Sequence, residues 1–143
     1  MRENESVTRV LIADDSEIAS EFLEQLLEAD AQIRVIGHAA TGRELLEHPS
    51  RKLAHVLLVD ILMPELGGLS VVRELAGEQR VIVVSSVDAD SKVASEAIAL
   101  GAAAFFSKRH LSQAREATRL RDAEGSLAAT TELLRHVAPG QRR

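Results

Sequence analysis

Three short, continuous apolar runs constrain the fold of this chain more than any other feature of its sequence. They are VLIA at Val10–Ala13, VLLV at Val56–Val59 and VIVV at Val81–Val84. Strands that are apolar at every position are buried on both faces, which is typical of parallel sheets with helices on either side. Two further runs, Ile33–Gly37 and Ala103–Phe106, complete a set of five predicted strands.

Amphipathic segments alternate with these runs and predict helices, because their apolar residues recur at helical spacing. The predicted helices are Ser16–Ala29, Thr41–Glu47, Leu69–Ala76, Asp90–Leu100 and Ser126–Val137. Strands that alternate with helices need right-handed crossovers and form a parallel sheet. The predicted fold is therefore α/β, a five-stranded parallel sheet in a three-layer sandwich.

The length of 143 residues fits a single domain. We expect residues 1–137 to form it. Residues 8–108 would be the core, and residues 109–137 the last connection and helix. The residues from 138 to 143 contain Pro and Gly followed by charged residues, and they are predicted to be a flexible tail.

The composition argues against several classes of function. The formal net charge is -5 and Trp and Tyr are absent, so neither nucleic acid nor an anionic membrane is an expected partner. The absence of Cys excludes disulfides and thiol chemistry. The polar N-terminus lacks the apolar core of a signal peptide, and no apolar run approaches the roughly 18 residues of a membrane span. We expect a cytoplasmic protein.

Reactive side chains directly follow four of the predicted strands. They are Asp14 and Asp15, then Asp60, then Ser85 and Ser86, then Ser107 and Lys108. Each of them alone is as compatible with a helix cap, a turn or a solvated charge. Because the carboxyl ends of parallel strands meet at one edge of a sheet, the set together predicts a ligand site there.

The predicted site suits phosphoryl transfer assisted by a metal ion. Three clustered carboxylates repel one another, and a hard divalent cation such as Mg²⁺ relieves that repulsion. A carboxylate is also a competent nucleophile towards phosphorus. Lys108 is the basic residue at this edge in a chain that has only three lysines. Its compact ammonium suits contact with phosphoryl oxygens.

Four motifs, in this order and spacing, resemble the response-regulator receiver domain of two-component signalling. They are ADDS at Ala13–Ser16, VDILMP at Val59–Pro64, VVSS at Val83–Ser86 and FFSK at Phe105–Lys108. The resemblance implies the flavodoxin-like strand order 2-1-3-4-5. VSSV and the ALGA run at Ala99–Ala102 are similar to the receivers of chemotaxis methylesterase-type regulators.

The resemblance also implies a role for each residue of the site. Asp60 would accept a phosphoryl group from a histidine kinase or a histidine phosphotransfer protein. Asp14, Asp15, Asp60 and the main-chain carbonyl of Leu62 would hold Mg²⁺. Lys108 would contact the phosphoryl oxygens.

Two further residues would report the phosphoryl group. The Ser85 hydroxyl would bond to it, and the Phe105 ring would follow the shift of Ser85. The expected function is a switch that controls a partner protein or an output domain missing from this chain. No enzymatic activity is expected beyond the chain's own Mg²⁺-dependent phosphorylation from a phosphodonor.

Alternatives remain open at this stage. The family usually has Pro after the lysine, whereas this chain has Arg109, so a phosphorylation-independent docking module with a receiver fold is the main alternative. A phosphatase of the dehalogenase type is disfavoured, because Leu62 stands where such enzymes need a second Asp. On the first helix, Ile18 and Phe22 are either core residues or part of the docking surface for the phosphodonor.

Overall fold

The computed structural model describes residues 7–64, 67–88, 90–109, 111 and 130–138. Its centre is a five-stranded sheet with the order β2-β1-β3-β4-β5, in which every neighbouring pair is parallel. The strands are β1 (Thr8–Ala13), β2 (Ile33–Ala39), β3 (Val56–Val59), β4 (Arg80–Ser85) and β5 (Ala104–Ser107). The predicted α/β fold and its strand order are confirmed.

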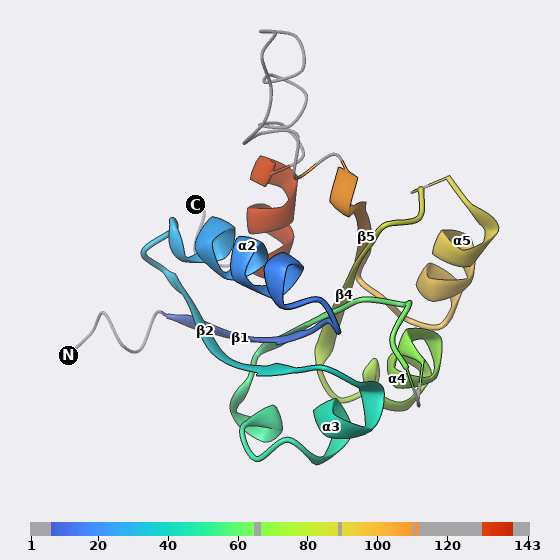
Figure 1. Ribbon diagram of the computed structural model, residues 1–143, viewed down its shortest axis with the longest axis horizontal. Helices are drawn as coiled ribbons and strands as arrows, with labels where there is room; N and C mark the ends of the chain where they lie inside the picture. The colour runs from blue at the N-terminus through green and yellow to red at the C-terminus, as the bar shows by residue number, and fades with distance from the viewer. Residues whose placement is uncertain (1–6, 65–66, 89, 110, 112–129, 139–143) are drawn as a thin grey trace, which may run out of the picture.

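Helices cover both faces of the sheet (Figure 1). They are α2 (Glu17–Glu28), α3 (Gly42–Glu47), α4 (Gly68–Leu75) and α5 (Lys92–Ala99), with a short 3₁₀ helix η1 (Arg51–Leu53) and a last helical segment over residues 130–137. The segment 130–137 and α2 lie on one face, while α3, α4 and α5 lie on the other.

The core is divided by the sheet into two apolar clusters. Val10 and Ile12 of β1 pack towards α2, whereas Leu11 and Ala13 pack on the opposite face. Successive side chains of a strand point to opposite faces, so a strand covered on both sides is buried at every position. All four positions of β3 are buried, as the continuous VLLV run predicted.

Hydroxyl side chains start three of the helices. The side chains of Ser16, Thr41 and Ser91 each accept a hydrogen bond from the backbone N–H three residues further on. Such caps satisfy one of the N–H groups that a helix start leaves without a partner. Because Ser91 is a cap, α5 begins at Lys92 rather than at the predicted Asp90.

The strand ends also differ slightly from the sequence prediction. β2 continues to Ala39, beyond the predicted Gly37, because Ala39 pairs with Ala13 at the end of β1. β4 continues to Ser85 and β5 to Ser107, and these two residues pair in register. The serines after the apolar runs therefore belong to the strands themselves, which fixes their direction relative to the sheet.

The C-terminal prediction is covered only in part. Of the predicted helix Ser126–Val137, residues 130–137 are helical and the earlier ones lie outside the described residues. Leu133 and Val137 are buried against the sheet, and the Arg80 Nε donates to the His136 carbonyl at 2.7 Å. Ala138, the first residue of the predicted tail, is buried rather than free. Residues 139–143 lie outside the described residues, so the flexible tail there stays a prediction.

Candidate functional site

Three strands bring the acidic residues and the lysine to one point. Asp14 follows β1, Asp60 follows β3 and Lys108 follows β5. The Lys108 ammonium lies 2.5 Å from Asp14 Oδ2 and 2.9 Å from Asp60 Oδ2. Asp14 and Asp60 are only 4% and 5% exposed, so this bridge joins two buried carboxylates. The structure thus brings Asp14, Asp60 and Lys108 together, as the sequence predicted.

The backbone next to each buried carboxylate holds it in place. Asp14 Oδ1 accepts the Ser16 N–H at 2.9 Å, just before α2 begins. Asp60 Oδ1 accepts the Leu62 N–H at 3.0 Å. Each carboxylate therefore has one oxygen fixed by a backbone N–H and the other facing the Lys108 ammonium.

The third carboxylate, Asp15, is exposed beside the buried pair. One oxygen from each of Asp14, Asp15 and Asp60 can be chosen so that all three lie within 4.8 Å of one another. The cluster joins three carboxylates with the one ammonium of Lys108, so it carries excess negative charge and offers hard oxygen ligands. This donor set fits Mg²⁺, which binds through a few carboxylates and keeps several waters.

Burial and charge shift the pKa values of two members of the site. Burial raises the pKa of the Asp14 carboxyl, and the hydrogen bonds from Lys108 and from the Ser16 N–H oppose that rise without cancelling it. For Lys108, burial acts to lower the pKa, but the facing carboxylates of Asp14 and Asp60 outweigh it and the net pKa is raised. The raised pKa values favour the cationic form of Lys108 and work against the anionic form of Asp14.

Gly68, the first residue of α4, shapes the backbone around Asp60. A Cβ on Gly68 would lie 2.4 Å from the Ile61 Cα and 2.5 Å from the Asp60 carbonyl oxygen. The Gly68 N–H donates to the Ile61 carbonyl at 3.0 Å. The first turn of α4 thus packs directly on the backbone that carries Asp60, and any larger residue would push the two apart.

The residues proposed to report the phosphoryl group lie on β4 and β5. Ser85 is fully buried, and its hydroxyl has no hydrogen-bond partner within the described ranges. Phe105 is half-buried and packs against the cluster on the α3, α4 and α5 face. Ser107 is also buried, and its hydroxyl has no partner within the same ranges either. The sequence reading placed Ser107 at this edge but gave it no role.

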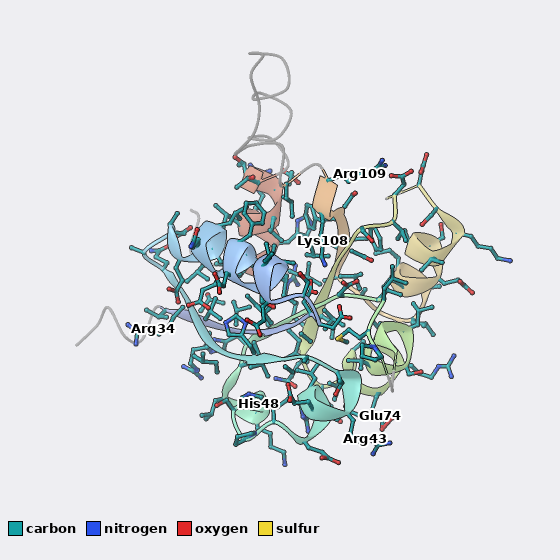
Figure 2. All side chains as sticks on the ribbon, viewed as in Figure 1. Arg34, Arg43, His48, Glu74, Lys108 and Arg109 are labelled. Atoms are coloured by element: carbon teal, nitrogen blue, oxygen red, sulfur yellow. The ribbon has the colours of Figure 1, made fainter. Side chains whose placement is uncertain are left out.

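Arg109 replaces the expected Pro after the lysine and forms an ion pair with Asp88 in the loop after β4. No cis peptide bond occurs in the described backbone. In Figure 2, Lys108 lies nearer the middle of the molecule than Arg109, which lies at the rim. Although Arg109 stands where the family usually has Pro, the Lys108 ammonium contacts the carboxylates of Asp14 and Asp60.

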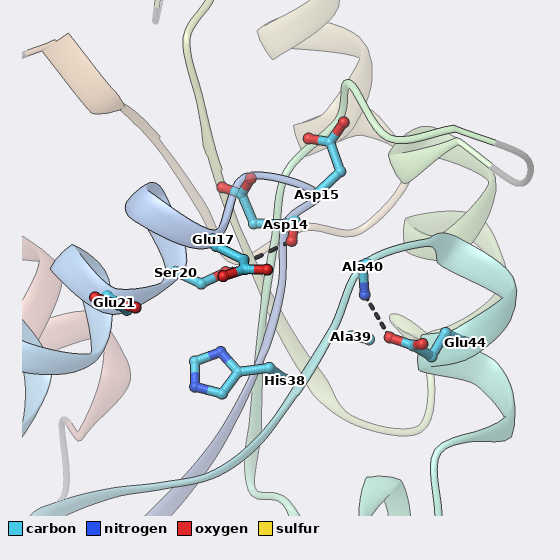
Figure 3. Close-up of a pocket in the computed structure, with 9 residues that line it drawn as sticks. All are labelled: Asp14, Asp15, Glu17, Ser20, Glu21, His38, Ala39, Ala40 and Glu44. Carbon is cyan, nitrogen blue, oxygen red and sulfur yellow. Dashed lines mark hydrogen bonds between the residues drawn. The ribbon is translucent and has the colours of Figure 1, made fainter.

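A cavity of about 350 Å³ opens beside the acidic residues, between α2 and the start of α3 (Figure 3). Acidic side chains line much of it: Asp14, Asp15, Glu17, Glu21 and Glu44. His38 also lines it, and its Nε2 lies 2.5 Å from Glu24 Oε1. The face next to Asp15 is therefore strongly negative, which the sequence reading did not predict.

Two apolar positions of α2 have different surroundings. Ile18 is 83% exposed, whereas Phe22 is half-buried and packs against the cluster beneath α2. The reading of both as core is therefore wrong for Ile18. Leu62, two residues after Asp60, is 54% exposed. Ile18 and Leu62 are two of the large apolar side chains that the described chain leaves exposed.

Comparison with known proteins decides the family. The sequence model of the response regulator receiver domain matches residues 10–119. The chain belongs to the response regulator receiver domain family. Phosphorylation on an aspartate is the general function of this family, and a receiver implies a histidine kinase as the phosphodonor.

Individual relatives point to one branch of the family. Over 106 residues the chain is 39% identical to protein-glutamate methylesterase/protein-glutamine glutaminase 5 of Myxococcus xanthus, which covers 72% of the chain and 30% of that protein. The response regulator domain of Thermotoga maritima CheB superposes with a TM-score of 0.74 at 28% identity. This match covers 93% of the chain and 97% of that domain. The predicted likeness to methylesterase-type receivers is confirmed.

Another solved structure shares the fold. The isolated receiver domain of RcsB from Salmonella enterica, studied with the phosphomimetic BeF₃⁻, matches with a TM-score of 0.65 at 20% identity. The match covers 80% of the chain and 92% of that domain.

These relatives correct one expectation. The sequence reading predicted no enzymatic activity beyond self-phosphorylation, but the similar curated proteins are protein-glutamate methylesterases, which are enzymes. The prediction is wrong in that respect. The chain spans about 30% of the length of these relatives, and the match covers their receiver domain.

No helix within the described ranges is long and apolar enough to cross a membrane. The cytoplasmic location stays a prediction.

Proposed function

We propose that this receiver accepts a phosphoryl group on Asp60 in a Mg²⁺-dependent reaction and thereby switches an output. The observation that carries the proposal is the contact of the Lys108 ammonium with both buried carboxylates, Asp14 at 2.5 Å and Asp60 at 2.9 Å. This arrangement neutralises the acceptor carboxylate and keeps a cation in place where phosphoryl oxygens would gather.

The residues around Asp60 are suited to hold the metal ion. Asp14, Asp15 and Asp60 would bind it through carboxylate oxygens, and Leu62 would add its main-chain carbonyl. Mg²⁺ bound there would supply charge neutralisation for the oxygens of the incoming phosphoryl group.

The chemical step needs little from the protein except position and charge. An Asp60 oxygen forms a bond to phosphorus while the phosphorus–nitrogen bond of a phosphohistidine breaks. The histidine nitrogen keeps that electron pair and takes up a proton. Lys108 moves from the Asp60 carboxylate onto the phosphoryl oxygens, and the Ser85 hydroxyl donates to one of them.

Intact mass spectrometry after incubation with Mg²⁺ and a small-molecule phosphodonor tests the proposal. The wild-type chain should gain one phosphoryl group, and Asp60→Ala should gain none. Asp30→Asn is a matched control, because Asp30 is also a carboxylate that accepts a backbone N–H, at Gln32, but lies outside the site. An adduct that persists in Asp60→Ala contradicts the assignment. No adduct on the wild-type chain supports the docking-module alternative.

The phosphodonor protein is proposed to dock beside Asp15, on the start of α2. Ser16, Ile18, Ala19 and Phe22 make up this docking surface. Support comes from Ile18, which is 83% exposed in the first turn of α2, two residues after the cap Ser16. Ala19 and Phe22 on the same helix are partly exposed, so with Ile18 they offer a contiguous apolar patch that a partner could bury.

Ile18→Ser should slow phosphoryl transfer from a histidine kinase but leave labelling by the small phosphodonor intact. Leu53→Ser is a matched control, because Leu53 is also exposed, at 59%, but lies on η1 away from the site. An equal loss of both reactions in Ile18→Ser would contradict the docking surface.

The output is proposed to be a catalytic domain like that of the methylesterase relatives. The support is the 39% identity to a protein of which the chain matches only 30%. Phosphorylation would then regulate the enzyme from its receiver.

A further inference from the structure

Two buried serines lie side by side where β4 and β5 end. Ser85 and Ser107 are paired in register across these parallel strands. Their relative exposures are 0% and 2%. Buried hydroxyl groups in proteins almost always have a hydrogen-bond partner, so two neighbouring exceptions call for an explanation. Within the described ranges, neither Oγ has one.

The packing of the preceding residues shows that both hydroxyls lie on the same face of the sheet. Val83 and Phe105 are a register pair, and both belong to the cluster beneath α3, α4 and α5. Val84 and Phe106 are the next pair, and both pack on the α2 face. Side chains alternate along a strand, so Ser85 and Ser107 return to the face of Val83 and Phe105.

The hydrogen-bonding capacity of a hydroxyl decides what the pair can do. A serine hydroxyl has one proton to donate and two lone pairs that accept. When Ser85 donates its proton to a phosphoryl oxygen on Asp60, its lone pairs become free to accept from a neighbour. A hydroxyl that donates to an anion becomes a better acceptor, because hydrogen bonds in a chain polarise one another.

We infer that Ser107 is a positioning residue for the phosphorylated state, which it stabilises by donating its hydroxyl proton to Ser85 Oγ. The phosphoryl oxygen, Ser85 and Ser107 then form a chain of hydrogen bonds that runs from β3 across β4 to β5. This inference rests on the proposed function of Asp60 and of Ser85. It adds a second hydroxyl, on the strand that also carries Phe105 and precedes Lys108.

The inference predicts that one substitution leaves the unphosphorylated state intact and weakens the phosphorylated state. Ser107→Ala removes a hydroxyl that has no partner in the described structure, so the unfolding free energy of the unphosphorylated chain should not fall. The same substitution should weaken binding of the phosphomimetic BeF₃⁻ in the presence of Mg²⁺. A loss of about threefold to tenfold corresponds to one ordinary hydrogen bond. A purely structural serine would instead lower stability and leave the affinity unchanged.

A double-mutant cycle on the 143-residue chain tests whether Ser107 acts through Ser85. Calorimetric titration with BeF₃⁻ and Mg²⁺ gives the affinity of the wild type, Ser85→Ala, Ser107→Ala and the double variant. The Ser107→Ala loss should appear in the wild-type background and vanish in the Ser85→Ala background. Ser70→Ala, which removes an exposed hydroxyl on α4, is the matched control and should bind like the wild type.

The outcomes separate this inference from the proposal on which it rests. No loss in Ser107→Ala, or an equal loss in both backgrounds, overturns the role of Ser107 and leaves Asp60 as the acceptor. Failure of the wild-type chain to bind BeF₃⁻ with Mg²⁺ overturns the proposed acceptor site, and the role of Ser107 with it.

Discussion

The two sides of the site differ in how completely their buried polar atoms are paired. On the acidic side, Asp14 and Asp60 contact the Lys108 ammonium and accept backbone N–H groups. On the reporting side, which consists of Ser85 and Ser107, neither hydroxyl has a partner within the described ranges. The acidic side is thus organised before any phosphoryl group arrives. The hydroxyls on the reporting side still have protons that they can donate when a phosphoryl group brings a new acceptor.

The largest effect is expected from a substitution that breaks the backbone of the acidic side. Gly68→Ala places a Cβ against the Ile61 Cα and the Asp60 carbonyl, and backbone atoms cannot move aside cheaply. Urea unfolding should show a loss of about 3 kcal/mol, as expected for severe overpacking.

Gly77→Ala is the matched control for Gly68→Ala. A Cβ on Gly77 meets nothing within 4 Å, so the control should be neutral or slightly stabilising. Equal stability of the two variants would contradict the close packing of α4 on the Asp60 backbone.

The next largest effect should follow removal of the cation. Lys108→Ala leaves two buried carboxylates facing each other. The Mg²⁺-free chain should lose about 2 kcal/mol of stability, less than for a fully buried pair because the Lys108 side chain is 21% exposed and partly screened by solvent. Because the positive charge is then missing, added Mg²⁺ should restore more stability to the variant than to the wild type. Lys92→Ala, at an exposed lysine, should change neither quantity. A variant as stable as the wild type without Mg²⁺ would show that Lys108 is not needed for charge balance.

A smaller effect is expected on the rate at which water hydrolyses the acyl phosphate of phosphorylated Asp60. Leu62 stands two residues after Asp60 and Val87 two residues after Ser85, and neither side chain offers a hydrogen bond to an attacking water. We expect a long-lived phosphorylated state. The double variant Leu62→Asn, Val87→Glu should lose its phosphoryl group about tenfold faster, because a polar group can position the water. Intact mass spectrometry over time measures the decay of both phosphorylated proteins. Equal rates of loss would contradict this expectation.

The smallest effect concerns the pH dependence of the acidic side. The pKa of Asp14 is raised in the folded chain, so the folded state binds more protons than the unfolded state as soon as the pH exceeds the ordinary value of 3.8. The unfolding free energy of the Mg²⁺-free chain should therefore fall as the pH rises from 3.8 to the raised pKa, and then level off.

Asp14→Asn should remove this fall, whereas Asp30→Asn should keep it. Urea unfolding at a series of pH values measures both variants. A pH profile of Asp14→Asn that is identical to that of the wild type would assign the dependence to another group.

The sequence predicted the fold well because its strands carry an unambiguous pattern. The run VLLV at β3 is apolar at every position, and the structure buries every one of its residues. The ends of β2 and β4 were predicted too early. Ala39 and Ser85 continue these strands by pairing with distant residues, which local periodicity does not encode. The 3₁₀ helix at Arg51–Leu53 was missed, since three residues are too few to show a period.

The site was predictable as a set of residues but not as a set of contacts. The positions of Asp14, Asp60 and Lys108 at strand ends sufficed to place them together. The role of Gly68 depends on how closely α4 approaches the Asp60 backbone, which no sequence pattern gives. The unpaired state of Ser107 likewise depends on register, because only the pairing with Ser85 shows which face it occupies.

Backbone amide chemical shifts on addition of BeF₃⁻ and Mg²⁺ test most directly whether the two sides are coupled. If BeF₃⁻ bound at Asp60 accepts a hydrogen bond from Ser85 and thereby engages Ser107, the amide shift changes should extend from Asp60 and Ser85 to Ser107 and Phe105 and into α5. Shifts confined to Asp14, Asp60 and their adjoining loops would contradict the coupling.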